Sequence, residues 1–226
     1  MTAPSSIIPP PERYGFRKAS PFRREPVRVP GVGPQPCRAM LIGERPGYDE
    51  SVSRTPTPFV GISGKYLDLC LQAANIDRST LYVTNLVKSF KNYLKPNAAD
   101  IAADHDELIT EVLACDPEII VLIGAWSVEN VLARSKSELD KCHGVPVRVT
   151  ELFDGELTGD WIVLAMIHPA SAAHSPESLG IILDDVITLG KLLDGEITPV
   201  TDEVTGGLDY RIVKARELDA ILRGAL

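Results

Sequence analysis

Residues 41–47, Leu-Ile-Gly-Glu-Arg-Pro-Gly, form an apolar run that passes directly into a turn bracketed by two glycines, and the fold prediction starts from them. In an open parallel sheet, ligands bind at the carboxyl ends of the strands, where backbone N–H groups and loop side chains converge. Glu44 and Arg45 place one acid and one base at such a position. Glycine and proline are also common in ordinary turns, so this stretch needs support from the rest of the chain.

Outward from this turn, short apolar runs alternate with amphipathic stretches, which is typical of strands separated by crossover helices. The expected strands are Ala39–Ile42, Leu81–Val83, Glu118–Ile123, Val145–Thr150 and Trp161–Met166. The expected helices are Gly64–Ala74, Ala99–Ala114, Ala125–Ala133 and Pro176–Leu193. The sequence therefore predicts a three-layer α/β/α fold around a mostly parallel sheet of four to five strands.

The length of 226 residues, 44% of them apolar, suffices for one buried core and little more. We expect an N-terminal arm over residues 1–36, one domain over 37–195 and a tail over 196–226 with a short helix at Ile212–Leu222. The chain shows neither a membrane-length apolar run nor the profile of a secretion signal at its start. We therefore expect a soluble, cytoplasmic monomer with no membrane partner.

Charge is distributed unevenly along the chain, although the net formal charge is −8. Residues 1–38 carry seven basic and two acidic side chains, and nine of the eighteen prolines. The remainder carries 16 basic and 29 acidic residues. The proline-rich basic arm is either a solvated linker or a segment whose arginines touch phosphates, and the second role predicts salt-dependent binding without sequence preference.

Four scattered cysteines, Cys37, Cys70, Cys115 and Cys142, form no C-x-x-C pair. Scattered cysteines are most often buried apolar fillers, and this is the interpretation we favour. The alternative is a metal or iron–sulfur site that folding assembles from distant ligands. We expect no disulfide, no metal and no cofactor.

Two further segments carry side chains that suit a nucleobase. Phe59 lies in a glycine-flanked loop, where its ring is able to stack on a base or to cover the core as a lid. Asn85 ends the second expected strand, and its amide offers the donor and the acceptor that the Watson–Crick edge of a pyrimidine requires. A turn or cap role is the simpler alternative for an isolated asparagine.

His168 ends the last expected strand. A fixed donor at this position would stabilise the negative charge that develops on a base oxygen when the base leaves its sugar. Capping of the following loop is the alternative role. Taken together, an acid, an aromatic ring, an amide and an imidazole are directed to one edge of one sheet.

These four segments, in this order and spacing, resemble the motifs of the family 4 (thermostable-type) uracil-DNA glycosylases, G-E-A-P-G, P-F-V-G-x-x-G, T-N-V-V-K and H-P-S. The resemblance covers about residues 38–193. It implies a uracil-DNA glycosylase-like fold and a DNA glycosylase that hydrolyses the N-glycosidic bond of a flipped uracil or modified pyrimidine. The partner that it implies is DNA, single-stranded or containing a modified base.

By this resemblance, Phe59 stacks on the flipped base, Asn85 binds the base edge and His168 serves the O2 oxygen. Glu44 would help to position or activate water. The other site residues implied are Gly43, Arg45 and Gly47 at the base, and Lys88, Ser171 and His174 at the DNA backbone. For Lys88, a solvated side chain is the plainer alternative.

The chain also departs from the family pattern. The family holds an iron–sulfur cluster with four cysteines, one of them directly after the lysine of the third motif, whereas Ser89 follows Lys88 here. We therefore predict no cluster. Arg45 replaces a small or amide residue, and we expect it to pair with Glu44 and lower its basicity or to reach a phosphate. Residues 91–99 lack the basic run of covalently trapping relatives, so no crosslinking is predicted.

Two other functions remain open. Arg45, the acidic remainder of the chain and the missing cluster cysteines favour a glycosylase-fold protein that binds DNA or a partner without turnover. A phage-like base-modification enzyme, in which Arg45 would contact phosphate, is the other alternative.

Overall fold

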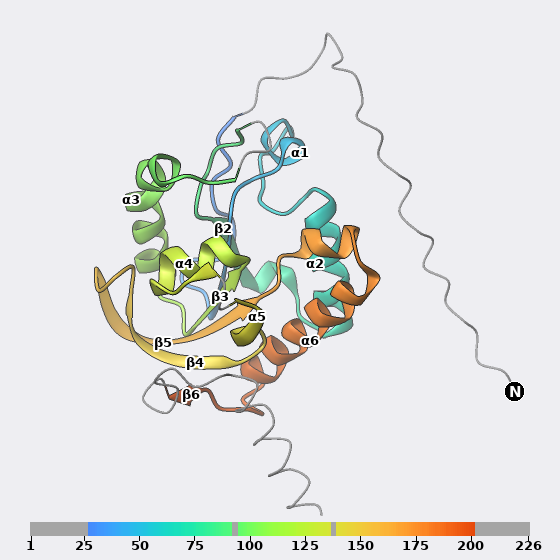
Figure 1. Cartoon of the computed structure of the whole chain (residues 1–226), viewed down its shortest axis with the longest axis vertical. Helices are drawn as coiled ribbons and strands as arrows, with labels where there is room; N and C mark the ends of the chain where they lie inside the picture. The colour runs from blue at the N-terminus through green and yellow to red at the C-terminus, as the bar shows by residue number, and fades with distance from the viewer. Residues whose placement is uncertain (1–26, 92–94, 137–138, 202–226) are drawn as a thin grey trace, which may run out of the picture.

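The computed structural model describes residues 27–91, 95–136 and 139–201, which form one α/β unit (Figure 1). Its sheet has the strand order β2-β1-β3-β5-β4-β6. The strands are β1 (Ala39–Gly43), β2 (Leu81–Asn85), β3 (Ile119–Ile123), β4 (Pro146–Leu152), β5 (Leu157–Met166) and β6 (Val200–Thr201). All neighbouring pairs are parallel except β4 and β5, which confirms the predicted mostly parallel sheet.

Helices cover both faces of the sheet and complete three layers (Figure 1). They are α1 (Tyr48–Ser51), α2 (Ile62–Ala73), α3 (Ala98–Cys115), α4 (Ala125–Leu132), α5 (Leu139–Cys142) and α6 (Pro176–Leu193). Apolar residues of α3 and α4 belong to one core cluster, and those of α2 and α6 belong to the other. The central strands are buried on both faces, which explains why they read as continuous apolar runs.

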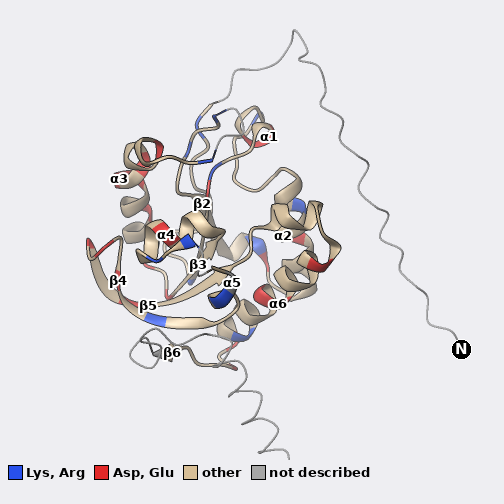
Figure 2. Cartoon of the chain, viewed as in Figure 1, with Lys and Arg blue, Asp and Glu red and all other residues tan. Residues whose placement is uncertain are grey.

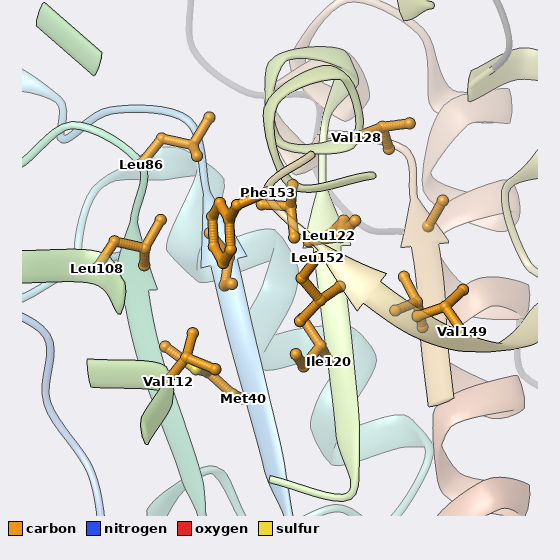
Figure 3. Close-up of a cluster of buried hydrophobic side chains, with 14 of the residues drawn as sticks. Met40, Leu86, Leu108, Val112, Ile120, Leu122, Val128, Val149, Leu152 and Phe153 are labelled. Carbon is orange, nitrogen blue, oxygen red and sulfur yellow. The ribbon is translucent and has the colours of Figure 1, made fainter. Parts of the chain in front are cut away.

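Alternation along β1 shows how one strand serves both clusters. Met40 and Ile42 pack with the α3 side, whereas Ala39 and Leu41 pack with the α2 side. Figure 3 shows the first cluster, in which Phe153 lies among side chains that include Met40 and Leu122. Burial of each large apolar side chain contributes about 1.5–3 kcal/mol to folding.

The antiparallel β4–β5 hairpin and the two-residue β6 are features that the sequence did not predict. Only the last five residues of β5, Ile162–Met166, are fully buried, so the apolar pattern revealed only that half of the strand. The predicted tail helix at Ile212–Leu222 and most of the predicted N-terminal arm lie outside the described residues. Among the helices that are described, none combines the length and the apolar character needed to cross a membrane.

Four parallel strands end at the same edge of the sheet, and this edge positions the site. Gly43 at the end of β1 is in register with Asn85 at the end of β2. Ile123 of β3 is in register with Met166 of β5, two residues before His168. The turn after β1, the end of β2 and the loop after β5 therefore emerge together, as predicted for an open parallel sheet.

Candidate active site

A pocket of about 230 Å³ opens at this edge of the sheet. It brings together five of the residues predicted from sequence, Arg45, Gly47, Phe59, Asn85 and His168. The other lining residues are Tyr48, Asp49, Glu50, Gly61, Ile62 and Ser63. Gly43 lies behind this wall, because a Cβ at Gly43 would meet the Phe59 ring at 2.6 Å.

Phe59 forms one side of the pocket and is only 4% exposed. Its backbone adopts a left-handed conformation, with φ of 56°, which an aromatic residue rarely takes. Gly64 permits this turn, since a Cβ there would collide with the Phe59 carbonyl. The Phe59 ring lies 6.1 Å from the His168 ring, centroid to centroid, with 32° between the planes.

Asn85 is 2% exposed, and its side-chain Nδ2 finds no hydrogen-bond partner within the described part of the chain. An unsatisfied buried donor costs about 1–3 kcal/mol, so such groups are rare unless a ligand completes them. The side chain lines the pocket beside Phe59. Asn85 is therefore placed to donate to an acceptor on a bound ring.

His168 follows β5 and is held in one tautomer. Its Nδ1 accepts a hydrogen bond from the backbone N–H of Ala170 at 3.1 Å, so the proton of the neutral ring resides on Nε2. Burial lowers the pKa of His168 to about 4. The residue is thus a neutral N–H donor at neutral pH.

Asp185 supports His168 from the side of α6. Its carboxylate, 1% exposed, accepts the backbone N–H of Ile167 at 3.2 Å and contacts Nδ1 of His143 at 2.9 Å. His143 was not among the site residues predicted from the sequence. Asp185 carried no sequence signal, because an acidic residue on a helix normally faces solvent.

Glu44 is turned away from the pocket. Its Oε1 accepts the backbone N–H of Trp126 at 3.1 Å, at the N-terminus of α4. Gly124 has φ of +93° and leaves the space that this carboxylate fills. Burial raises the pKa of Glu44. This direction is opposite to the lowered basicity expected from a pair with Arg45.

Arg45 instead pairs with Asp100 of α3, with Nη2 and Oδ2 2.6 Å apart, and the expectation of a pair with Glu44 is wrong. The hydrogen bond from Arg45 lowers the pKa of Asp100. Both side chains are largely buried, at 7% and 14% exposure. Asp100 lies 55 residues from Arg45, so a local sequence pattern could not reveal the partner.

Glu50 is a pocket residue that the sequence analysis missed. Its side chain is buried, and Oε2 accepts the backbone N–H of Gly47 at 2.7 Å. Burial raises its pKa, while hydrogen bonds from backbone N–H groups of Gly47 and the Phe59–Gly61 turn oppose that rise. In sequence, an acid in a short polar helix looks exposed. Its place three residues after Gly47 was the signal available.

Lys88 is fully buried, so the prediction that it contacts the DNA backbone is wrong. Its ammonium is 2.6 Å from Oε2 of Glu111. Ser171 lies in the turn after His168, where its hydroxyl donates to the His168 carbonyl at 2.9 Å. Ser171 is partly buried and His174, at the end of the same turn, is exposed. Contact of these two residues with the DNA backbone stays a prediction.

The four cysteines are buried, as expected of apolar fillers. Cys37 and Cys115 are neighbours, since the backbone N–H of Cys37 donates to the Cys115 carbonyl at 2.8 Å. Cys70 packs in the α2 cluster, while Cys37, Cys115 and Cys142 pack in the cluster on the opposite face of the sheet. Within the described ranges, no group of three or more histidine, cysteine or acidic side chains is arranged to hold a metal.

Comparison with known proteins places this architecture in a family. Residues 30–186 match the uracil DNA glycosylase superfamily. The type-4 uracil-DNA glycosylase of Archaeoglobus fulgidus is 29% identical over 168 residues, which cover 74% of this chain and 82% of that protein. The type-4 enzymes of Thermotoga maritima and Saccharolobus solfataricus are 28% and 27% identical over 70% and 76% of this chain, and over 79% and 78% of their own lengths. The chain therefore belongs to the uracil-DNA glycosylase superfamily.

Proposed function

We propose that this protein is a DNA glycosylase that flips a uracil or a modified pyrimidine into the pocket and hydrolyses its N-glycosidic bond. The observation that carries the proposal is the buried, unsatisfied Nδ2 of Asn85 in the same pocket as the neutral His168 and the Phe59 ring. On one flat base, Asn85 would bind the edge, His168 would bind an oxygen and the Phe59 ring would stack on the face. The superfamily membership supports DNA as the partner.

In the proposed reaction, the bond between the sugar C1′ and the base nitrogen breaks, the hydroxyl of a water adds to C1′, and the remaining proton of that water ends on the released base. The leaving base retains the bonding electrons, so negative charge grows on its oxygens. The Nε2–H of His168 would donate to the O2 oxygen as this charge develops. Loss of one such preorganised donor typically slows catalysis by about 10²–10³-fold.

The carboxylates have separate proposed roles. Asp49 and Glu50 are the two acids that line the pocket, and the buried Glu50 is our candidate for contact with the base or an attacking water. Glu44, the sequence candidate for water activation, would act indirectly by holding the turn after β1 against α4. Comparing Glu50→Gln with Glu44→Gln assigns the catalytic carboxylate, since the variant with the larger loss of excision identifies it.

Arg45, Gly43 and Gly47 would shape the base-binding wall, with Arg45 fixed by Asp100. Ser171 and His174 remain our candidates for contact with the DNA backbone next to the flipped nucleotide. These assignments require no cofactor.

The test is excision from oligonucleotides that each contain one uracil or modified pyrimidine, single-stranded and paired. We expect abasic sites with at least one base, and a loss of about 100-fold or more in Asn85→Ala and His168→Ala. An absence of abasic product across the panel would refute the enzymatic function.

The orientation of Glu44 favours one alternative, a protein of this fold that binds DNA without turnover. Its carboxylate caps α4 and is absent from the pocket lining described above. Salt-sensitive binding to the same oligonucleotides that survives His168→Ala, without abasic product, would support this alternative.

A further inference from the structure

Lys88 is a buried charge for which the proposed reaction has no direct use. Its side chain is 0% exposed, and its Nζ donates to three acceptors. These are Oγ1 of Thr84 at 2.5 Å, the backbone carbonyl of Asn85 at 2.9 Å and Oε2 of Glu111 at 2.6 Å. An ammonium has three protons, so its donor capacity is satisfied.

Glu111 of α3 is the counter-ion and joins three parts of the fold. Its Oε2 accepts the Thr84 hydroxyl at 2.8 Å as well as the Lys88 ammonium, and its Oε1 accepts the backbone N–H of Gly31 at 3.2 Å. The pair therefore links the segment before β1, the end of β2 and the C-terminal part of α3. Burial lowers the pKa of Lys88, and Glu111 opposes that shift.

At the end of β2, neighbouring side chains face opposite sides of the sheet. Successive side chains of a strand point to opposite faces, so Thr84 faces α3 while Asn85 faces Phe59 and the pocket. Lys88 reaches the Asn85 carbonyl from the α3 side. Its hydrogen bond therefore fixes the backbone of Asn85 from behind, opposite to the direction in which a base would bind.

Stability alone does not explain a charged pair here. Desolvation costs several kcal/mol for each buried ion, and well-packed apolar residues of similar volume often stabilise a fold equally well. An apolar pair would lack the directional bond to the Asn85 carbonyl. Misplacement of a recognition group by about 1 Å can cost about 100-fold in rate.

We propose that Lys88, neutralised by Glu111, is a positioning residue that orients Asn85 for recognition of the base edge. This inference rests on the proposed function, in which Asn85 binds the flipped base. It gives the buried lysine a role in excision without any contact to DNA.

The test uses the double variant Lys88→Met/Glu111→Gln, which removes both charges. The introduced side-chain amide has an oxygen that can accept the Gly31 N–H and an NH₂ group that can donate to the Thr84 hydroxyl. Val112→Ala is the matched control, because it deletes buried methyl groups next to Glu111 on α3 without altering the ammonium. Each change is made in the full chain, alone and combined with Asn85→Ala. Single-turnover excision is measured on a uracil-containing single strand, and the melting temperature is recorded for every variant.

We expect Lys88→Met/Glu111→Gln to lose about 30- to 100-fold in excision with Asn85 present, and less than about 3-fold in the Asn85→Ala background. Val112→Ala should lose less than about 3-fold. Equal losses in the two backgrounds would show a general structural role and overturn the proposal. If the double variant does not fold, Glu111→Gln alone carries the same comparison, with an expected loss of about 3- to 10-fold, and wild-type excision by that variant overturns the proposal.

A second readout separates this inference from the proposed function. The Asn85 side-chain amide gives a pair of NMR resonances that are assigned by their disappearance in Asn85→Ala. We expect these resonances to shift or broaden in Lys88→Met/Glu111→Gln and to remain unchanged in Val112→Ala. If the wild-type protein excises no base, the proposed function fails, and unchanged Asn85 resonances in the double variant would still overturn the positioning role.

Discussion

His168 is fixed as a neutral donor by two local features, burial and the hydrogen bond from Ala170 to Nδ1. Because its pKa is about 4 in the folded protein and about 6.5 ordinarily, the unfolded chain takes up this proton first as the pH falls. The contribution of His168 to the free energy of unfolding is therefore fully present above about pH 6.5 and is lost as the pH falls toward about 4.

The lowered pKa of His168 predicts that the free energy of unfolding depends differently on pH in the wild type and in His168→Gln. Between about pH 6.5 and about pH 4.5, the wild-type free energy of unfolding should fall by about 2 kcal/mol more than that of the variant. Urea unfolding across this range measures both. His174→Gln, at an exposed histidine in the same turn, should follow the wild type, and parallel curves for wild type and His168→Gln would contradict the assignment.

Gly43 leaves the space that the side chains of Asn85 and Phe59 occupy at the pocket. A Cβ there would press on the Asn85 amide oxygen and on the Phe59 ring. We expect Gly43→Ala to cost about 1–3 kcal/mol in stability, since overpacking forces its neighbours to shift, and to reduce excision. Gly180→Ala is the control, because that position on α6 meets nothing within 4 Å and alanine should stabilise the helix by about 0.5–1 kcal/mol. Thermal melts and excision assays on both variants decide the point.

At the scale of elements, a polar contact joins the segment before β1 to α3. Asp104 is 2% exposed; its Oδ1 accepts from Arg28 at 2.6 Å, and its Oδ2 accepts the backbone N–H of Lys88 at 2.7 Å. Arg28 also contacts Glu107. One carboxylate thus connects three segments beside the end of β2.

Asp104→Ala should destabilise the protein by about 2–4 kcal/mol, because it leaves the Lys88 N–H without its acceptor and Arg28 without its buried partner. Chemical denaturation measures this effect. Asp106→Ala, two residues along the same helix and exposed, should change the free energy of unfolding by less than about 0.5 kcal/mol. Similar effects of the two substitutions would show that Asp104 has no special structural role.

The sequence predicted the elements that have a clear apolar pattern and missed those that depend on pairing. All five long strands and the four long helices were expected, because the strands stand out as short apolar runs and the helices repeat apolar residues at helical spacing. The β4–β5 hairpin was missed because its outer half is exposed. In the pocket, Asn85 and His168 were identified because each stands at the end of an expected strand, and Phe59 because it lies in a glycine-flanked loop. Lys88 was misjudged because its partner, Glu111, lies 23 residues away.

At the scale of the whole molecule, the distribution of charged side chains determines which segments could attract the phosphates of a DNA strand. Figure 2 shows acidic residues spread over α3, α6 and the β4–β5 hairpin. The N-terminal 26 residues carry five basic and two acidic side chains, whereas residues 202–226 carry four basic and five acidic ones. The two terminal segments are therefore similar in length and differ in the sign of their net charge.

Deletion of residues 1–26 should weaken binding to single-stranded DNA at low salt and reduce the slope of log Kd against log salt by about 2–4. Deletion of residues 202–226 should leave the slope nearly unchanged. Fluorescence anisotropy between about 25 and about 200 mM salt measures both slopes. Equal slopes for the full chain and the N-terminal deletion would show that residues 1–26 do not contact the DNA.

Short strand contacts occupy both edges of the sheet. Val32 pairs with Val83 at the β2 edge, and β6 pairs with β4 at the other edge. Unpaired edges recruit further chains by strand addition, which leads to aggregation or domain exchange. Val83 on one edge and Val147 and Arg148 on the other are covered in this way, so a partner that docks at these positions by β-augmentation would first have to displace Val32 or β6. The cost of that displacement disfavours self-association at these positions.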